Sequence, residues 1–367
     1  MPSVPLRTFH YIRSWLTGRD DVASREVVLH RGDTTVPATL LTPGKSRKPI
    51  PAWIVLHGIT RPGRGHGQLV RFTHAVAQGG CAVLVPEVPE WRELALAPGL
   101  TVPTVMASLR ALRSEPDIRP GPVGLLGFSF GAPQAIAASA HPEIGPHLAG
   151  VVGFGGYCDL ERTVLFQLTG DHEWNGTSYH LRPDPYGRWI VAANYLTAVP
   201  GLDDAHDVAE GLRCLAAEAG DRGIMSWDPC FDPLKDEIRG GLRAGRHRDV
   251  FDLFAPPSGR EPERAQAEEM GHALAAAARR VDPSIEPEPL FSGAPGPVHL
   301  LHGVRDHLIP FTEIRRLERA LPTGIRSRTT VTPLFGHSAH DPVPGWWEGA
   351  REGVRFVRAL SAVLGLV

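Results

Sequence analysis

The sequence has little of what nucleic-acid binding or disulfide stabilisation requires. Its 38 Lys and Arg residues are balanced by 40 Asp and Glu, for a formal net charge of −2 at pH 7. No basic run stands out that would neutralise a phosphate backbone, so we expect no nucleic-acid partner. The four cysteines include no C-x-x-C pair, and we expect them to be reduced and structural. A bridge from Cys230 to Cys158 or Cys214 stays open.

Long apolar runs are also missing. Residues 1–20 lack the basic head and apolar core of a signal peptide, and no stretch reaches the roughly 20 apolar residues of a membrane span. We therefore predict a cytoplasmic protein without a membrane span. The sequence does not decide the oligomeric state, and a homo-oligomer stays open.

What the chain does contain is enough apolar sequence for a large core. It has 367 residues, of which 42% are hydrophobic and 21% charged, the ordinary balance of a globular protein. Short apolar runs alternate with helical patterns, as is typical of parallel strands buried on both faces of a sheet. These runs follow a predicted hairpin at 26–41 and lie at 53–56, 81–85, 123–126 and 148–154.

The alternation stops after Cys158, and helical patterns at 202–220 and 261–281 occupy the interval that follows. Strands and helices then resume at 298–301, 312–321, 328–332 and 346–364. We predict a doubly wound, mostly parallel α/β sheet with an inserted helical cap. The predicted parts are the first core segment at 1–158, the cap at 159–290 and the second core segment at 291–367.

The strongest local signal is the Gly-x-Ser-x-Gly pattern at 127–131, which follows an apolar run and precedes helix-like sequence. A serine in a sharp strand-to-helix turn must adopt a strained backbone, and the two glycines remove side chains that would collide there. The Ser129 hydroxyl would then be exposed as a nucleophile at the sheet edge. The pattern also arises by chance in a chain with 40 glycines, but the strand before it and the helix after it favour the functional interpretation.

Four motifs together resemble the α/β-hydrolase superfamily. They are Gly127-Phe128-Ser129-Phe130-Gly131, His57-Gly58, Gly303-Val304-Arg305-Asp306 and Gly336-His337. The order Ser, Asp, His along the chain also matches that superfamily. The resemblance covers residues 26–158 and 291–367, and the insert lies where the superfamily usually places its cap. It implies the α/β-hydrolase fold and a serine hydrolase that needs no cofactor.

The resemblance also implies the roles of individual residues. Ser129, Asp306 and His337 would form a catalytic triad, with Asp159 as the alternative acid and His340 as the alternative base. An imidazole has an unperturbed pKa of about 6.5, which suits a general base near neutral pH.

The resemblance supplies two oxyanion donors as well, the backbone amides of Ile59 and Phe130. The sequence at 57–60 departs from the HGGG form of one esterase group, which puts bulky tertiary-alcohol esters in doubt. Other ligand classes have weaker signals. His299, His302 and His307 straddle a strand and its loop, so we expect no metal site. The glycine-rich stretch at 61–67 lacks the order of a phosphate-binding loop.

Together these features predict a carboxylesterase-like serine hydrolase. Its substrate would be a small-molecule ester or related acyl compound, cleaved through an acyl-enzyme on Ser129. An acyltransferase or peptidase of the same fold is one alternative. It is distinguished by whether an alcohol or amine acceptor outcompetes water. A non-catalytic ligand-binding relative is another, and the complete Ser, Asp and His set argues against it.

The general-base role of His337 predicts that the rate depends on pH. For an ester substrate, kcat/KM rises with pH through an apparent pKa of about 6 to 7.5, because only the neutral imidazole accepts the serine proton. The profile is measured under conditions in which circular dichroism shows the protein folded. A flat profile across that window contradicts an imidazole base.

Overall fold

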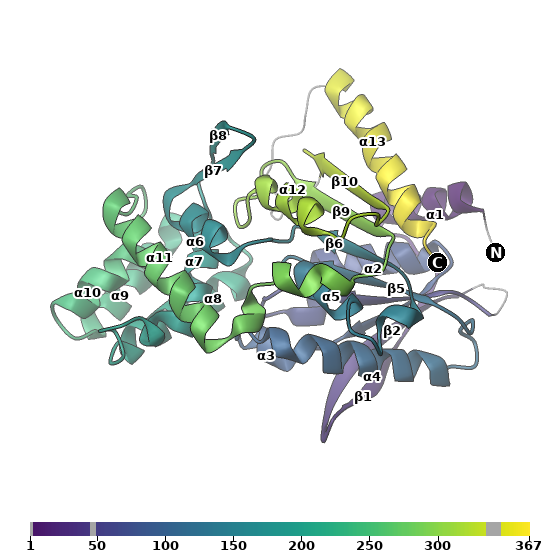
Figure 1. The fold of residues 1–367 in the computed structure, drawn as a ribbon, viewed down its shortest axis with the longest axis horizontal. Coiled ribbons are helices and arrows are strands. Elements are labelled where there is room, and N and C mark those ends of the chain that lie inside the picture. The colour runs from purple at the N-terminus through teal and green to yellow at the C-terminus, as the bar shows by residue number, and fades with distance from the viewer. Residues whose placement is uncertain (1–2, 45–48, 335–345) are drawn as a thin grey trace.

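The computed structural model describes residues 3–44, 49–334 and 346–367. Its central feature is an eight-stranded sheet with the strand order β1-β2-β4-β3-β5-β6-β9-β10 (Figure 1). The strands are β1 (Val22–Arg31), β2 (Thr34–Pro43), β3 (Ala52–Leu56), β4 (Ala82–Pro86), β5 (Val123–Phe128), β6 (Leu148–Phe154), β9 (Val298–Gly303) and β10 (Ser327–Thr332). All apolar runs that the sequence predicted as strands are present in this sheet.

Neighbouring strands pair antiparallel at one end of the sheet and in parallel over the rest. β1 and β2 form the predicted antiparallel hairpin, which turns at Gly32 with a φ of 61°, a left-handed value that favours glycine. β2 pairs antiparallel with β4, and from β4 to β10 all neighbours pair in parallel. The predicted doubly wound, mostly parallel sheet is therefore confirmed. The loops that follow the parallel strands meet at one edge of the sheet.

Helices cover both faces of this sheet (Figure 1). In β3, Trp53 and Val55 pack into one hydrophobic core, whereas Ile54 and Leu56 pack into the other. This alternation explains why the strand sequences are continuously apolar. The first core includes α1 (Val4–Thr17), α2 (Gly67–Gln78) and α13 (Trp346–Leu364), and the second includes α4 (Thr101–Ser114), α5 (Gly131–Ser139) and α12 (Phe311–Ala320). The four-residue helix α3 (Pro89–Arg92) follows β4.

The chain between β6 and β9 forms a largely helical lobe beside the sheet (Figure 1). Its elements are α6 (Leu160–Thr169), β7 (Asp171–Trp174), β8 (Thr177–His180), α7 (Pro185–Tyr195), α8 (His206–Arg222), α9 (Asp232–Gly241), α10 (Arg246–Phe254) and α11 (Arg264–Val281). The sequence pattern did not predict the β7–β8 hairpin, because its short strands carry no apolar run. Trp189, Phe231, Phe251 and Phe254 are fully buried and form a core within the lobe. The cap boundaries at 159 and 290 stay a prediction.

One predicted helix has different ends in the structure. Gly220 was expected to stop the helix at 202–220, but α8 continues to Arg222. The residue that ends it is the C-cap Gly223, with a φ of 64°. Gly220 lies within the helix, where a Cβ would be 3.3 Å from Cγ of Arg61 and 3.4 Å from the Tyr186 hydroxyl. This glycine therefore permits close packing of α8 against a core loop.

All four cysteines are free, with Cys81 and Cys158 buried and Cys214 and Cys230 exposed. Among the helices of the described residues, none combines the length and apolar character that crossing a membrane requires.

Burial of the lobe's aromatic core predicts a large effect of truncation on stability. Phe251→Ala should lower the free energy of unfolding by about 3 to 5 kcal/mol, because it removes a ring with 0% exposure and leaves a cavity. The matched control is Phe9→Ala, whose ring is 58% exposed and whose loss should change stability by less than about 0.5 kcal/mol. Urea titration followed by circular dichroism measures both. Equal effects would contradict this account of the lobe.

Candidate active site

Ser129 lies in the turn between β5 and α5, with a left-handed backbone. Its φ is 53°, a conformation that costs a non-glycine residue free energy and is typical of a nucleophile turn. Two backbone hydrogen bonds hold the turn. The Ser129 N–H donates to the carbonyl of Phe154 at the end of β6 (2.7 Å), and the Ala132 N–H donates to the Ser129 carbonyl (2.9 Å). The side chain is half-buried, and the residue lies at the carboxyl end of β5.

Three glycines allow this turn to be so tight. A Cβ on Gly127 would lie 1.9 Å from the carbonyl oxygen of Gly131, and a Cβ on Gly131 would lie 2.7 Å from that of His57. A Cβ on Gly58 would lie 3.1 Å from Ser129 Cβ and 3.6 Å from its Oγ. The loop after β3 therefore packs directly against the serine side chain.

The two amides expected to bind an oxyanion both adjoin Ser129. Phe130 follows it in the chain and precedes the first turn of α5, and Ile59 follows Gly58 in the packed loop. Within the described part of the chain, neither N–H donates to a protein acceptor. The N-terminus of α5 adds its partial positive charge beside the Phe130 amide.

His57 fixes the orientation of one of these amides from the interior. Its ring is buried, and Nδ1 donates to the Gly58 carbonyl at 2.7 Å. Because the C=O and N–H of a trans peptide point in opposite directions, this bond also sets the direction of the Ile59 N–H. Nε2 of His57 accepts from the Val88 N–H at 3.1 Å and lies 3.0 Å from Oε1 of the buried Glu87.

Glu87 was missed by the sequence analysis. A signal for it existed, because this carboxylate directly follows the buried strand β4. Arg64 and Arg92 also approach it, with Nε of Arg64 at 3.5 Å and Nη1 of Arg92 at 3.8 Å from Oε2. The pair of His57 and Glu87 therefore lies within a charged cluster behind the loop after β3.

Asp306 is buried in the loop after β9, which lies two strands away from β5 in the sheet. Its Oδ1 accepts hydrogen bonds from the N–H groups of Leu308 (2.9 Å) and Ile309 (3.0 Å). Nε2 of the fully buried His302 lies 3.2 Å from Oδ2 and 2.9 Å from the Ile309 carbonyl. The carboxylate is thus held rigidly at the same edge of the sheet as Ser129.

The predicted base His337 and its alternative His340 lie outside the described residues. Of the three histidines considered for metal, His302 and His307 have separate environments, since their rings contact the carbonyls of Ile309 and Arg182, respectively. Among the described residues, no three His, Cys, Asp or Glu side chains converge as a metal site would require.

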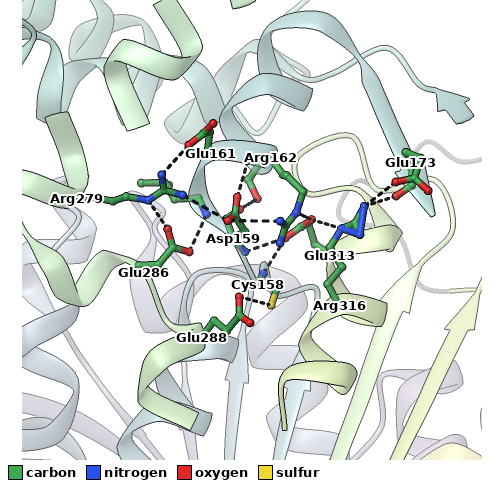
Figure 2. A network of polar contacts seen from close by, with 12 residues as sticks. Cys158, Asp159, Glu161, Arg162, Glu173, Arg279, Glu286, Glu288, Glu313 and Arg316 are labelled. Carbon is green, nitrogen blue, oxygen red and sulfur yellow. Dashed lines mark hydrogen bonds and ion pairs between the residues drawn. The ribbon is translucent and has the colours of Figure 1, made fainter. Parts of the chain in front are cut away.

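Asp159, the alternative acid, is engaged in a structural network (Figure 2). It is the N-cap of α6, and its Oδ1 accepts from the Arg162 N–H at 2.8 Å. Its Oδ2 lies 3.4 Å from Nη2 of Arg279 and 3.5 Å from Nη1 of Arg162. These contacts are those of a helix cap and an ion pair, and they occupy both carboxylate oxygens.

The buried Glu313 on α12 organises the same junction (Figure 2). Its carboxylate accepts from the N–H groups of Cys158 (3.0 Å) and Asp159 (2.9 Å) and from Nε of Arg162 (3.0 Å). Burial raises the pKa of Glu313, whereas Arg162 and the backbone donors lower it. The carboxylate therefore joins the start of the insert to a helix of the second core segment.

Comparison with known proteins identifies the fold. No family model and no curated protein sequence matches the chain. Among solved structures, the acylaminoacyl peptidase of Pyrococcus horikoshii superposes with a TM-score of 0.52 at 10% identity, over 94% of this chain and 42% of that one. Brefeldin A esterase, a bacterial homologue of human hormone-sensitive lipase, superposes with a TM-score of 0.50 at 15% identity, over 99% and 85% of the two chains. This chain has the α/β-hydrolase fold.

The predicted α/β-hydrolase fold is therefore confirmed, and at these identities the similarity concerns the fold alone. The chain spans 42% of the peptidase's length, so that protein's activity is not transferred to this one. Within an α/β-hydrolase fold, the loops after β3, β5 and β9 lie together at the carboxyl edge of the sheet. These loops contain Ile59, Ser129 and Asp306.

The contacts of the two aspartates predict different effects of substitution. Asp306→Asn should lower kcat by roughly 10² to 10⁴-fold, because an amide favours the wrong imidazole tautomer and does not balance the charge that develops on the ring. Asp159→Asn is the matched control, with a loss below about tenfold, because its carboxylate caps a helix. Steady-state kinetics on both variants, with folding checked by circular dichroism, measure the difference. Near-normal activity in Asp306→Asn with collapse in Asp159→Asn would refute the assignment.

Proposed function

We propose that the protein is a serine hydrolase that cleaves carboxylic esters, with Ser129 as its nucleophile. The observation that carries this proposal is the left-handed backbone of Ser129 between β5 and α5, with Gly58 packed against its side chain. A strained residue at this place in an α/β-hydrolase fold exposes a hydroxyl beside two available amides. That combination suits attack on an acyl carbon and stabilisation of the resulting oxyanion.

The proposed mechanism has two half-reactions. His337 takes the proton of Ser129 as the serine oxygen attacks the acyl carbon, and the N–H groups of Ile59 and Phe130 donate to the oxyanion. The tetrahedral intermediate expels the alcohol, which receives the proton from His337. Water then attacks the acyl-enzyme with His337 again as base, the C–O bond to Ser129 breaks, and His337 returns the proton to the serine oxygen as the carboxylic acid leaves. Asp306 orients the ring and stabilises the imidazolium.

Asp306 suits this role because its environment holds the carboxylate in a fixed position. Two backbone N–H groups donate to one of its oxygens. The residue is 1% exposed, so little water screens its field. Such a carboxylate stabilises a neighbouring imidazolium more than a solvated one would.

The insert serves as the cap of the proposed site. It contacts the loop after β3 through Tyr186, whose hydroxyl donates to the Ile59 carbonyl at 3.3 Å. It contacts the loop after β9 through Asp184, whose N–H donates to the His307 carbonyl at 2.7 Å. Attachment to both loops suits a lobe that covers Ser129, as the cap of this fold does.

The proposal predicts selective labelling of one serine. A fluorophosphonate should label Ser129 stoichiometrically, and Ser129→Ala should lose both labelling and hydrolysis of p-nitrophenyl esters while remaining folded. Ser139→Ala is a matched control, because Ser139 ends the helix that follows Ser129 and its buried hydroxyl donates to the Ile136 carbonyl. That variant should keep full labelling.

Mass spectrometry of the labelled peptide identifies the site. Labelling at another serine, or ester turnover retained in Ser129→Ala, would overturn the assignment. A panel of p-nitrophenyl esters of rising chain length measures the acyl preference. Added alcohols or amines that outcompete water would assign the protein to acyl transfer instead.

A further inference from the structure

The first turn of cap helix α7 is fixed by its own N-cap. Asp184 is buried, and its Oδ1 accepts from the N–H groups of Tyr186 (3.0 Å) and Ser226 (3.3 Å). Pro185 occupies the first helical position, where its fixed φ suits the helix. The Tyr186 side chain therefore projects from a rigid part of the cap.

Tyr186 reaches from this turn to the loop beside Ser129. Its hydroxyl donates to the Ile59 carbonyl at 3.3 Å. Burial raises the pKa of Tyr186 well above its ordinary value, so the hydroxyl keeps its proton and stays a donor at neutral pH. Gly220 of α8 permits this placement, since a Cβ there would lie 3.4 Å from the Tyr186 hydroxyl oxygen.

The loop after β3 has three carbonyl groups held by side chains. His57 binds that of Gly58 (2.7 Å), Tyr186 that of Ile59 (3.3 Å) and Arg92 that of Arg61 (2.9 Å). His57 and Arg92 belong to the sheet domain, whereas Tyr186 belongs to the cap. The peptides before and after Ile59 are thus held from opposite lobes, which restrains both dihedral angles of the proposed oxyanion donor.

The same short segment of the cap also holds the loop of the proposed acid. Nδ1 of His307 donates to the Arg182 carbonyl at 2.7 Å, and the Asp184 N–H donates to the His307 carbonyl at 2.7 Å. Residues 182–186 therefore connect the loop after β3 with the loop after β9. A displacement of this segment would disturb both loops at once.

We propose that Tyr186 is a positioning residue of the oxyanion hole, which holds the Ile59 amide toward the substrate through its bond to the Ile59 carbonyl. The inference rests on the proposed hydrolase function and adds a dependence of the active geometry on the cap. Tyr186 touches neither substrate nor oxyanion. It acts by removing freedom from the loop, so that Ile59 N–H needs no reorganisation when negative charge develops.

The chain offers a closely matched control for the test. Tyr195 lies on the same helix, and its hydroxyl donates to the Leu96 carbonyl of another core loop at the same 3.3 Å. Tyr186→Phe and Tyr195→Phe thus each remove one hydroxyl that joins α7 to the core. Only the first of these hydroxyls contacts the loop of a proposed oxyanion donor.

The experiment compares p-nitrophenyl ester kinetics with the binding of a trifluoromethyl ketone, whose serine adduct carries an oxyanion. Tyr186→Phe should lower kcat about 10- to 100-fold with KM within about threefold of wild type, less than the loss of a direct donor. The affinity of the ketone should fall by a similar factor. Tyr195→Phe should change neither quantity by more than about threefold, and thermal melts compare the stability of both variants.

The outcomes separate this inference from the function on which it rests. The inference is wrong if Tyr186→Phe and Tyr195→Phe have the same kcat and the same ketone affinity. This holds whether both variants resemble the wild type or both lose activity equally. A rise in KM at unchanged kcat would overturn it too, because that result indicates substrate binding. Absence of fluorophosphonate labelling and turnover in the wild-type protein would overturn the proposed function and this inference together.

Discussion

The left-handed backbone of Ser129 is the constraint on which the surrounding structure depends. Its φ of 53° costs roughly 1 to 3 kcal/mol, so neighbouring groups must hold it in place. The hydrogen bond from Ser129 N–H to Phe154 attaches the turn to the next strand of the sheet. Gly58 brings the loop after β3 into contact with it, and the helical lobe in turn contacts that loop through Tyr186. Sheet, turn, loop and lobe therefore form one continuous chain of contacts.

The features that the sequence predicted well are those encoded in adjacent residues. Buried parallel strands are continuous apolar runs, and the hairpin turn at Gly32 and the serine pattern at 127–131 each lie within a few positions. Helix ends were less certain, because a glycine that stops a helix and one that permits close packing look alike in sequence. Gly223 ends α8, whereas Gly220 lies within it and leaves room for Tyr186. Only the folded position of Tyr186 distinguishes the two roles.

The contacts that could not be predicted join residues far apart in the chain. Tyr186 and Ile59 are separated by 127 positions, and nothing in their local sequences indicates that they meet. Asp306 and Asp159 were alternatives because both follow a parallel strand, and the contacts of Asp159 with the α6 N-terminus and Arg279 could not be read from the sequence. The assignment of His337 rests on its place in the sequence after β10, in the order that the superfamily uses.

The buried Glu313 also has a consequence for how the protein is made. It joins α12 to the N–H groups of Cys158 and Asp159, across 155 and 154 positions. On a ribosome, the whole lobe from α6 to α11 emerges before this carboxylate does. During that interval those two amides lack this acceptor, and Arg162 has Asp159 but not Glu313 as a carboxylate partner. The contacts of the lobe with the first core segment can form earlier, whereas this junction closes only after α12 has been synthesised.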